Sequence, residues 1–110
     1  MEINGHDVVA LKNRYMSNNS LAIQLYSRTI GLYATLTLNL PESDDLEYGY
    51  AFVDVDSCPW AKEFIKKYEL GYFATKYASN GWGTYPLYKF DVNKLEDYYD
   101  SARITFDEEN

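Results

Sequence analysis

Hydrophobic and polar positions alternate most regularly in residues 32–40. Leucine or alanine occupies every even position from Leu32 to Leu40, and tyrosine, threonine or asparagine occupies the odd positions. Successive side chains of a β-strand point to opposite faces, so this period of two predicts a half-buried strand. Residues 21–26 alternate in the same way, and residues 8–15 are expected to pair with them across a turn at 17–20. The first forty residues therefore predict an antiparallel meander.

Residues 48–70 predict a strand followed by a helix. The segment Asp-Ser-Cys-Pro at 56–59 is typical of a helix start, because Asp and Ser can cap free N–H groups and Pro fits the first turn. Gly71 is expected to end this helix. Three aromatic residues share one helical face at a spacing of four: Trp60, Phe64 and Tyr68.

The last forty residues predict a second hairpin and a short helix. Aromatic-rich residues 72–77 and 85–90 flank a glycine-containing turn at 79–83. Asp91 is expected to cap a helix over about residues 93–99, and residues 103–106 are expected to add an edge strand. The whole chain thus predicts a single α+β domain, with an antiparallel sheet of six or seven strands and two short helices packed on it. Its expected parts are a meander (8–40), an acidic loop (41–47), a strand–helix unit (48–70), a hairpin (71–91), a short helix (92–100) and an acidic tail (101–110).

The composition fits one soluble domain. The chain has 110 residues, of which 46% are hydrophobic and 25% charged, enough for a single core. The N-terminal residues lack the basic and apolar regions of a secretion signal, and no apolar run approaches the roughly 20 residues that span a bilayer. The single cysteine, Cys58, cannot form an internal disulfide. We therefore expect a cytoplasmic protein that does not enter a membrane.

The charge is strongly acidic and unevenly distributed. Seventeen Asp and Glu against ten Lys and Arg give a net charge of −7, and no cationic residue occurs between Arg28 and Lys62. Such a chain disfavours direct binding to a nucleic-acid backbone, duplex DNA included, or to an anionic membrane surface, and it favours a basic partner. The candidate partner-binding residues are the acids of two acidic segments and the tryptophan of the glycine turn: Glu42, Asp44, Asp45, Glu47, Asp54, Asp56, Trp82, Asp97 and Asp100.

Two interpretations of the central acids remain open. If the chain is extended, Asp54 and Asp56 lie on one face about 7 Å apart, a spacing on the scale of neighbouring phosphates in a nucleic acid. Alternatively, Asp56 caps the helix, Asp54 completes a turn, and the acids of residues 41–47 keep an exposed loop soluble. The first interpretation predicts a nucleic-acid mimic, and the second predicts ordinary structural and surface roles.

Catalysis and metal binding have little support. His6, the single histidine, lies in an N-terminus that we expect to be mobile, and a metal site of Cys58, His6 and an aspartate has no favourable spacing. Cys58 at a helix start could carry a reactive thiol, but a packing role is the simpler interpretation. We therefore expect no enzymatic activity, cofactor or metal. The aromatic residues of 72–90 either stack on single-stranded nucleic acid or form cross-strand pairs.

Two segments of the chain resemble a small, largely uncharacterised bacterial protein family. They are residues 51–65, which contain Cys-Pro-Trp-Ala, and residues 85–91, which begin with Tyr-Pro-Leu-Tyr and are followed by Lys94 and Leu95. Members of that family travel on conjugative elements, plasmids and phages. The chain departs from the family pattern in residues 72–77 and in the acidic tail. The resemblance implies a mobile-element context, in which small acidic proteins often inhibit host defence as anti-restriction or anti-CRISPR proteins.

We therefore hypothesise a non-enzymatic, anti-CRISPR-like inhibitor of a defence nuclease. Its acidic surface would occupy a basic groove that binds nucleic acid or the PAM, most plausibly in a Cas nuclease carrying its guide RNA. The acids of 41–47 would steer the encounter, Asp54 and Asp56 or Asp97 and Asp100 would contact Arg and Lys, and Trp82 would be a buried anchor. The alternative is an accessory module of the mobile element that docks a basic protein or holds single-stranded nucleic acid.

Overall fold

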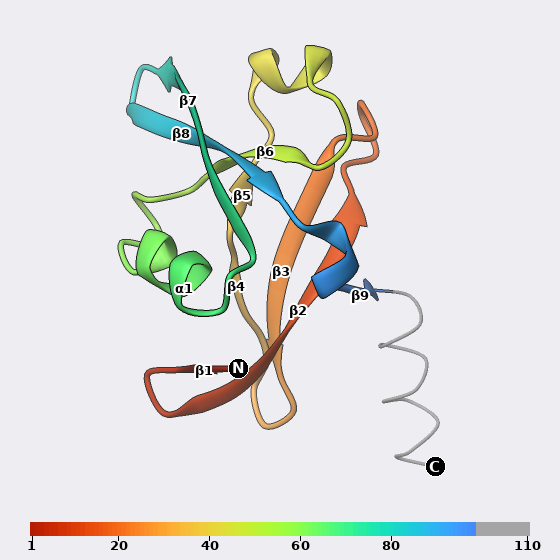
Figure 1. Cartoon of the computed structure of the whole chain (residues 1–110), viewed down its shortest axis with the longest axis vertical. Coiled ribbons are helices and arrows are strands. Elements are labelled where there is room, and N and C mark those ends of the chain that lie inside the picture. Colours follow the sequence, from red (N-terminus) through yellow and green to blue (C-terminus); the bar gives the residue numbers. More distant parts are fainter. Residues whose placement is uncertain (99–110) are drawn as a thin grey trace.

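The computed structural model describes residues 1–98, which form two β-sheets and one α-helix (Figure 1). The elements are β1 (Glu2–Ile3), β2 (His6–Arg14), β3 (Leu21–Ser27), β4 (Gly31–Thr35), β5 (Thr37–Leu38), the 3-10 helix η1 (Pro41–Asp45), β6 (Tyr50–Val53), α1 (Ala61–Lys67), β7 (Gly71–Asn80), β8 (Gly83–Phe90), the 3-10 helix η2 (Val92–Lys94) and β9 (Glu96–Asp97). The first sheet has the order β1-β2-β3-β4 with β9 beside β2, and the second has the order β5-β6-β8-β7. Every strand pair is antiparallel except β2 with β9.

This architecture is broadly the expected α+β class, but it differs from the expectation in two respects. Within the described residues there are two sheets rather than one, and one α-helix rather than two. The main core lies where the two sheets and α1 meet, and it includes Ile23 and Leu25 from the first sheet and Phe90 from the second. A smaller core around Phe52 and Leu87 lies on the other face of the second sheet.

The meander is confirmed, but the strand expected over residues 32–40 is divided at Leu36. The Leu36 N–H donates to the Ile23 carbonyl of β3, whereas its own carbonyl accepts from the Asp54 N–H beyond β6. Leu36 therefore carries the chain from the first sheet to the second, and its side chain is fully buried. At the other end of the expected strand, Leu32 is about half exposed, because it lies beside the hairpin turn of β3 and β4.

Helix α1 has the expected aromatic face but a different C-terminal signal. Phe64 packs against both Trp60 and Tyr68, with ring centroids 5.9 and 4.9 Å apart. The expectation that Gly71 ends the helix is wrong, because Glu69 takes the left-handed conformation with φ 53°. Two hydrogen bonds, from Glu69 N–H to Lys66 O and from Leu70 N–H to Ile65 O, then form a Schellman motif.

The segment after β8 forms less helix than expected. Asp91 does cap it, since its carboxylate accepts the Asn93 N–H at 3.2 Å. Between Asp91 and Asp97, however, only the three residues of η2 are helical, because Leu95 turns into the core and β9 pairs with β2 in parallel. The helix expected over 93–99 is therefore wrong at residues 95–97, while residues 93–94 belong to η2 and Tyr98 is helical. The expected strand at 103–106 and the acidic tail lie outside the described residues.

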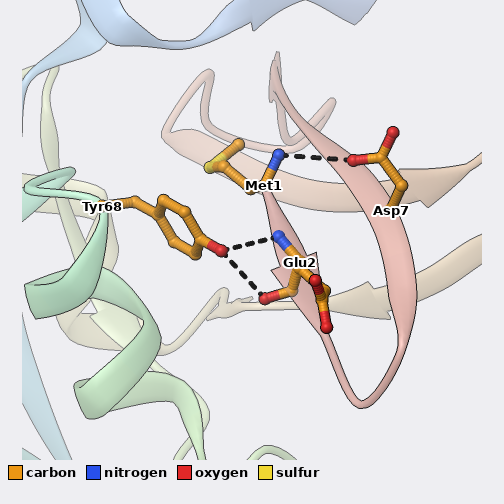
Figure 2. A network of polar contacts seen from close by, with 4 residues as sticks. All are labelled: Met1, Glu2, Asp7 and Tyr68. Carbon is orange, nitrogen blue, oxygen red and sulfur yellow. Dashed lines mark hydrogen bonds and ion pairs between the residues drawn. The ribbon is translucent and has the colours of Figure 1, made fainter.

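The N-terminus is held against α1. Figure 2 shows the Tyr68 hydroxyl between the two backbone groups of Glu2: the Glu2 N–H donates to it at 2.7 Å, and it donates to the Glu2 carbonyl at 3.2 Å. The terminal amino group lies 3.5 Å from Asp7 Oδ1. His6, which we expected in a mobile segment, begins β2, and its ring packs 5.4 Å from that of Tyr33. As far as Tyr98, no helix has the length and apolarity needed to cross a membrane.

Candidate functional site: binding surfaces

The acids of residues 41–47 lie on a firmly held turn rather than on an irregular loop. We call Glu42, Asp44, Asp45 and Glu47, on η1 and just after it, the acidic turn; all four side chains are exposed. Its central residue, Ser43, is buried, and its hydroxyl accepts the Leu40 N–H at 3.0 Å while its own N–H donates to Leu40 O. The amide of Asn18, in the β2–β3 turn, donates to Asp44 Oδ1 at 2.7 Å. These contacts hold the backbone of the turn and the Asp44 carboxylate in place.

The negative charge of the acidic turn is uncompensated. Among residues 1–98, no Lys or Arg forms an ion pair with any of its four carboxylates. Arg14, which lies at the same end of the molecule, is engaged elsewhere. Its guanidinium stacks over the Tyr48 ring at 3.9 Å and donates to the Asn19 carbonyl. The turn therefore presents several exposed carboxylates at one end of the protein (Figure 1).

Asp54 and Asp56 do not form the extended pair that a phosphate mimic requires. β6 ends at Val53, and Asp54 folds the next residues into a turn, with its Oδ1 accepting the Ser57 N–H at 3.0 Å and its carbonyl accepting the Cys58 N–H. The structural interpretation of Asp54 as a turn residue is thus correct. Asp56 does not cap α1, because no side chain caps that helix; its Oδ2 instead accepts from the Tyr85 hydroxyl at 3.3 Å. Burial and the Asp56 carboxylate raise the pKa of Tyr85.

The other predicted contact residues lie apart from the acidic turn. Trp82 is 88% exposed at the tip of the β7–β8 hairpin, and its N–H is held by the Asn80 side chain at 2.8 Å. Asp97 is in β9, which pairs with β2 in the first sheet, and Figure 1 shows β9 below the yellow coil of η1 along the long axis. Asp100 lies outside the described residues. Among the described residues, Trp82 and Asp97 thus lie on other elements than the acidic turn.

The aromatic residues of the β7–β8 hairpin include both cross-strand pairs and exposed rings, the two arrangements that the sequence left open. Tyr88 is buried and pairs with Phe73 across the strands, with ring centroids 6.1 Å apart. Tyr72, Phe73 and Tyr77 of β7, however, are 63%, 36% and 55% exposed. Between this hairpin and α1 runs a groove of about 980 Å³, lined by aromatic residues and by Lys62 and Lys66. The sequence analysis missed this groove, although the spacing of four between the two lysines places them on one helical face.

The residues considered for catalysis have structural roles. Cys58 is buried, its thiol donates to the Thr35 carbonyl at 3.6 Å, and burial together with Asp54 raises its pKa. A thiol with a raised pKa carries little of the reactive thiolate at neutral pH. The part of the chain that the structure describes contains no group of His, Cys, Asp and Glu that could hold a metal.

Comparisons with known proteins identify the family but no individual relative. Residues 10–109 match a protein family described as a domain of unknown function (DUF4313). Neither the curated proteins nor the solved structures gave a match. Because the match spans nearly the whole chain, from the middle of β2 onward, this protein belongs to the DUF4313 family.

Proposed function

We propose that this protein is a non-enzymatic binding domain that docks its acidic turn onto a basic surface of a macromolecular partner. The observation that carries the proposal is the combination of exposure, lack of ion pairs and fixed geometry at the acidic turn. Like charges at this density repel one another, and a cationic partner relieves the repulsion. Because the turn is already ordered, little conformational entropy is lost when it binds.

The partner that we propose is the basic nucleic-acid groove of a host defence nuclease, of which a Cas nuclease with its guide RNA is the first choice. Two features support this choice: the net charge of −7 on a short chain, and the resemblance of residues 51–65 and 85–91 to proteins of bacterial mobile elements. The contact set is narrower than the sequence indicated. The contacts to the partner are made by Glu42, Asp45 and Glu47. Asp54 and Asp56 make hydrogen bonds within the fold and are not part of this contact set.

The proposal is tested by preincubating the purified nuclease and its guide with this protein and then measuring cleavage of target DNA. The informative variant is Glu42→Gln/Asp45→Asn, which removes two charges of the acidic turn without changing side-chain size. The matched control is Glu2→Gln/Glu63→Gln, which removes two exposed charges elsewhere and gives the same net charge. We expect the first variant to inhibit at least about tenfold less well, since hydrogen bonds to charged groups contribute about 1.5–3 kcal/mol each.

The control variant separates a specific contact from a general effect of charge. If both variants lose inhibition equally, net charge rather than the acidic turn governs binding. If wild-type protein leaves cleavage intact with several nuclease types, the choice of partner is wrong.

A further inference from the structure

A bulge in β7 creates a pair of exposed rings beside the groove. Phe73 lies opposite Tyr88 and Tyr77 lies opposite Pro86, so four steps along β7 correspond to two steps along β8. In a regular strand, residues four apart are about 13 Å from each other. Here the looped-out residues shorten that separation, and the Phe73 and Tyr77 ring centroids lie only 5.1 Å apart, at an interplanar angle of 51°.

The bulge that brings the two rings together contains a strained residue. Thr75, in the looped-out segment, has φ 55°, a left-handed conformation that is a genuine outlier for a β-branched residue. Its hydroxyl donates to the Ala74 carbonyl at 2.8 Å. Such strain costs of the order of 1–3 kcal/mol and concentrates at sites where geometry serves function. The gain visible in this structure is the close placement of two large rings that remain partly open to solvent.

The rings continue into the groove as a row that becomes more buried. From Tyr77 and Phe73 the row passes to Tyr88, which is 8% exposed, and then to Phe90, which is 2% exposed. Tyr88 and Phe90 line the floor of the groove, while the wall is formed by α1, which lies beside the hairpin (Figure 1). A flat ring system can therefore stack on the outer pair and extend towards the floor.

The helix wall of the groove carries available positive charge. Lys62 and Lys66 are exposed, lie one turn apart on α1, and form no ion pair within residues 1–98. Of the acids that line the groove, Glu69 lies 3.9 Å from Lys94, and the Asp91 carboxylate caps η2. Glu63 is a third acid at the rim. Lys89 also lines the groove, with its ammonium 4.8 Å from the centroid of the Tyr50 ring. The groove thus has three lysines and three acids beside its aromatic faces, and two of the lysines lie on the helix wall.

We infer that this groove binds a short stretch of single-stranded nucleic acid. A base stacks on the Phe73–Tyr77 pair, and backbone phosphates contact Lys62 and Lys66. Aromatic stacking combined with lysine–phosphate contacts is the chemistry by which proteins hold single strands without sequence preference. A duplex is excluded, because its bases are stacked inside and cannot reach the rings. The inference is independent of the proposed docking of the acidic turn, which uses other residues.

Fluorescence anisotropy with a labelled eight-nucleotide oligothymidylate tests the inference on the full chain. Tyr77→Leu is the main variant, since this ring is more than half exposed and its loss leaves the core intact. Loss of one stacked base weakens binding by about 5- to 150-fold. The matched control is Trp82→Leu, which removes an even more exposed ring outside the groove and is expected to change little.

A second variant tests the cationic wall. With two phosphates neutralised, the slope of log K against log salt is about −1.4 for a single strand, and Lys62→Gln/Lys66→Gln brings it close to zero. Lys67→Gln, whose ammonium lies over the Tyr68 ring, is the control that keeps the slope. Thermal melting confirms that each variant folds.

Three results overturn the inference. The first is no binding of the oligonucleotide up to roughly 1 mM protein, beyond the Kd range of ordinary non-specific sites. The second is a loss of binding in Trp82→Leu but not in Tyr77→Leu. The third is preferential binding of a labelled glutamate-rich peptide over the oligonucleotide, which would assign the groove to an acidic protein segment.

Discussion

Gly71 offers the sharpest test of how closely β7 and β8 pack, because a side chain at this position would meet the backbone of β8. A Cβ at this position would lie 2.5 Å from the Lys89 carbonyl oxygen and 3.0 Å from the Phe90 Cα, both backbone atoms of β8. Ordinary contacts of a Cβ begin at 3.4 Å, so β7 and β8 must separate locally by roughly 1 Å to admit it. This close approach, rather than a helix end, explains the glycine. Gly71→Ala is therefore a steric change at the junction of the two strands.

The expected cost follows from the geometry. Overpacking of this kind destabilises by typically 1–3 kcal/mol, and about 2 kcal/mol lowers the melting temperature of a domain of this size by roughly 10 °C. Gly81→Ala is the matched control, because nothing lies within 4 Å of a Cβ at Gly81 and its φ is not left-handed. A compatible glycine replaced by alanine gains about 0.4–1 kcal/mol through the unfolded state. The two variants thus differ in the sign of their effect.

Urea denaturation followed by circular dichroism measures both variants. We expect the midpoint of Gly71→Ala to fall and that of Gly81→Ala to stay or rise, with equal slopes for the two proteins. If Gly71→Ala is within about 0.5 kcal/mol of Gly81→Ala, the strands do not approach as closely as described, and the reasoning is refuted.

Three further predictions concern hydroxyl and thiol groups. Tyr68→Phe removes the hydroxyl that holds both backbone groups of Glu2, so β1 should gain amide hydrogen exchange and stability should fall by about 0.5–1.5 kcal/mol; unchanged exchange in β1 would show that the contact is not formed in solution. The buried Cys58 thiol should react with a thiol reagent at neutral pH only after denaturation, and fast labelling of native protein would contradict its packing role. Burial raises the pKa of Tyr15 and Tyr88 above the ordinary value of 10.0. The unfolded chain therefore loses these protons at lower pH than the folded protein, so stability should fall as pH rises above 10.0. Ultraviolet titration of native and denatured protein checks which of the two ionises first.

The fold was predictable where local pattern and tertiary structure agree. The aromatic face of α1 and the β7–β8 hairpin follow from spacing alone, because they need only neighbours in sequence. The break at Leu36 could not be predicted, since the alternation continues through it. The partners that divide the strand are Ile23 of β3, in the first sheet, and Asp54, which directly follows β6 of the second sheet. The prediction that Gly71 ends α1 was wrong for a related reason. A glycine after a helix is typical of a C-terminal cap, but this glycine allows a close contact between two strands.

The candidate site was predictable in composition but not in arrangement. The exposed carboxylates of the acidic turn follow from a segment in which four of the six residues 42–47 are acidic and only Leu46 is apolar. The involvement of Asp56 with Tyr85 could not be predicted, because 29 residues separate the partners. The aromatic groove needs α1 and the hairpin side by side, and no local pattern gives that placement. It also depends on a bulge at Thr75, where no glycine or asparagine signals a left-handed residue.

Nuclease cleavage at two salt concentrations tests whether the acidic turn of this protein competes for a basic groove of the nuclease. Wild-type protein is preincubated with a Cas nuclease and its guide before target DNA is added. We expect loss of cleavage at low salt and substantial recovery at high salt, because screening shortens the reach of exposed charges from about 10 Å at 0.1 M to about 3 Å at 1 M. Inhibition that is equally strong at both salt concentrations would contradict an electrostatic mechanism, and full cleavage at low salt would contradict the proposed partner.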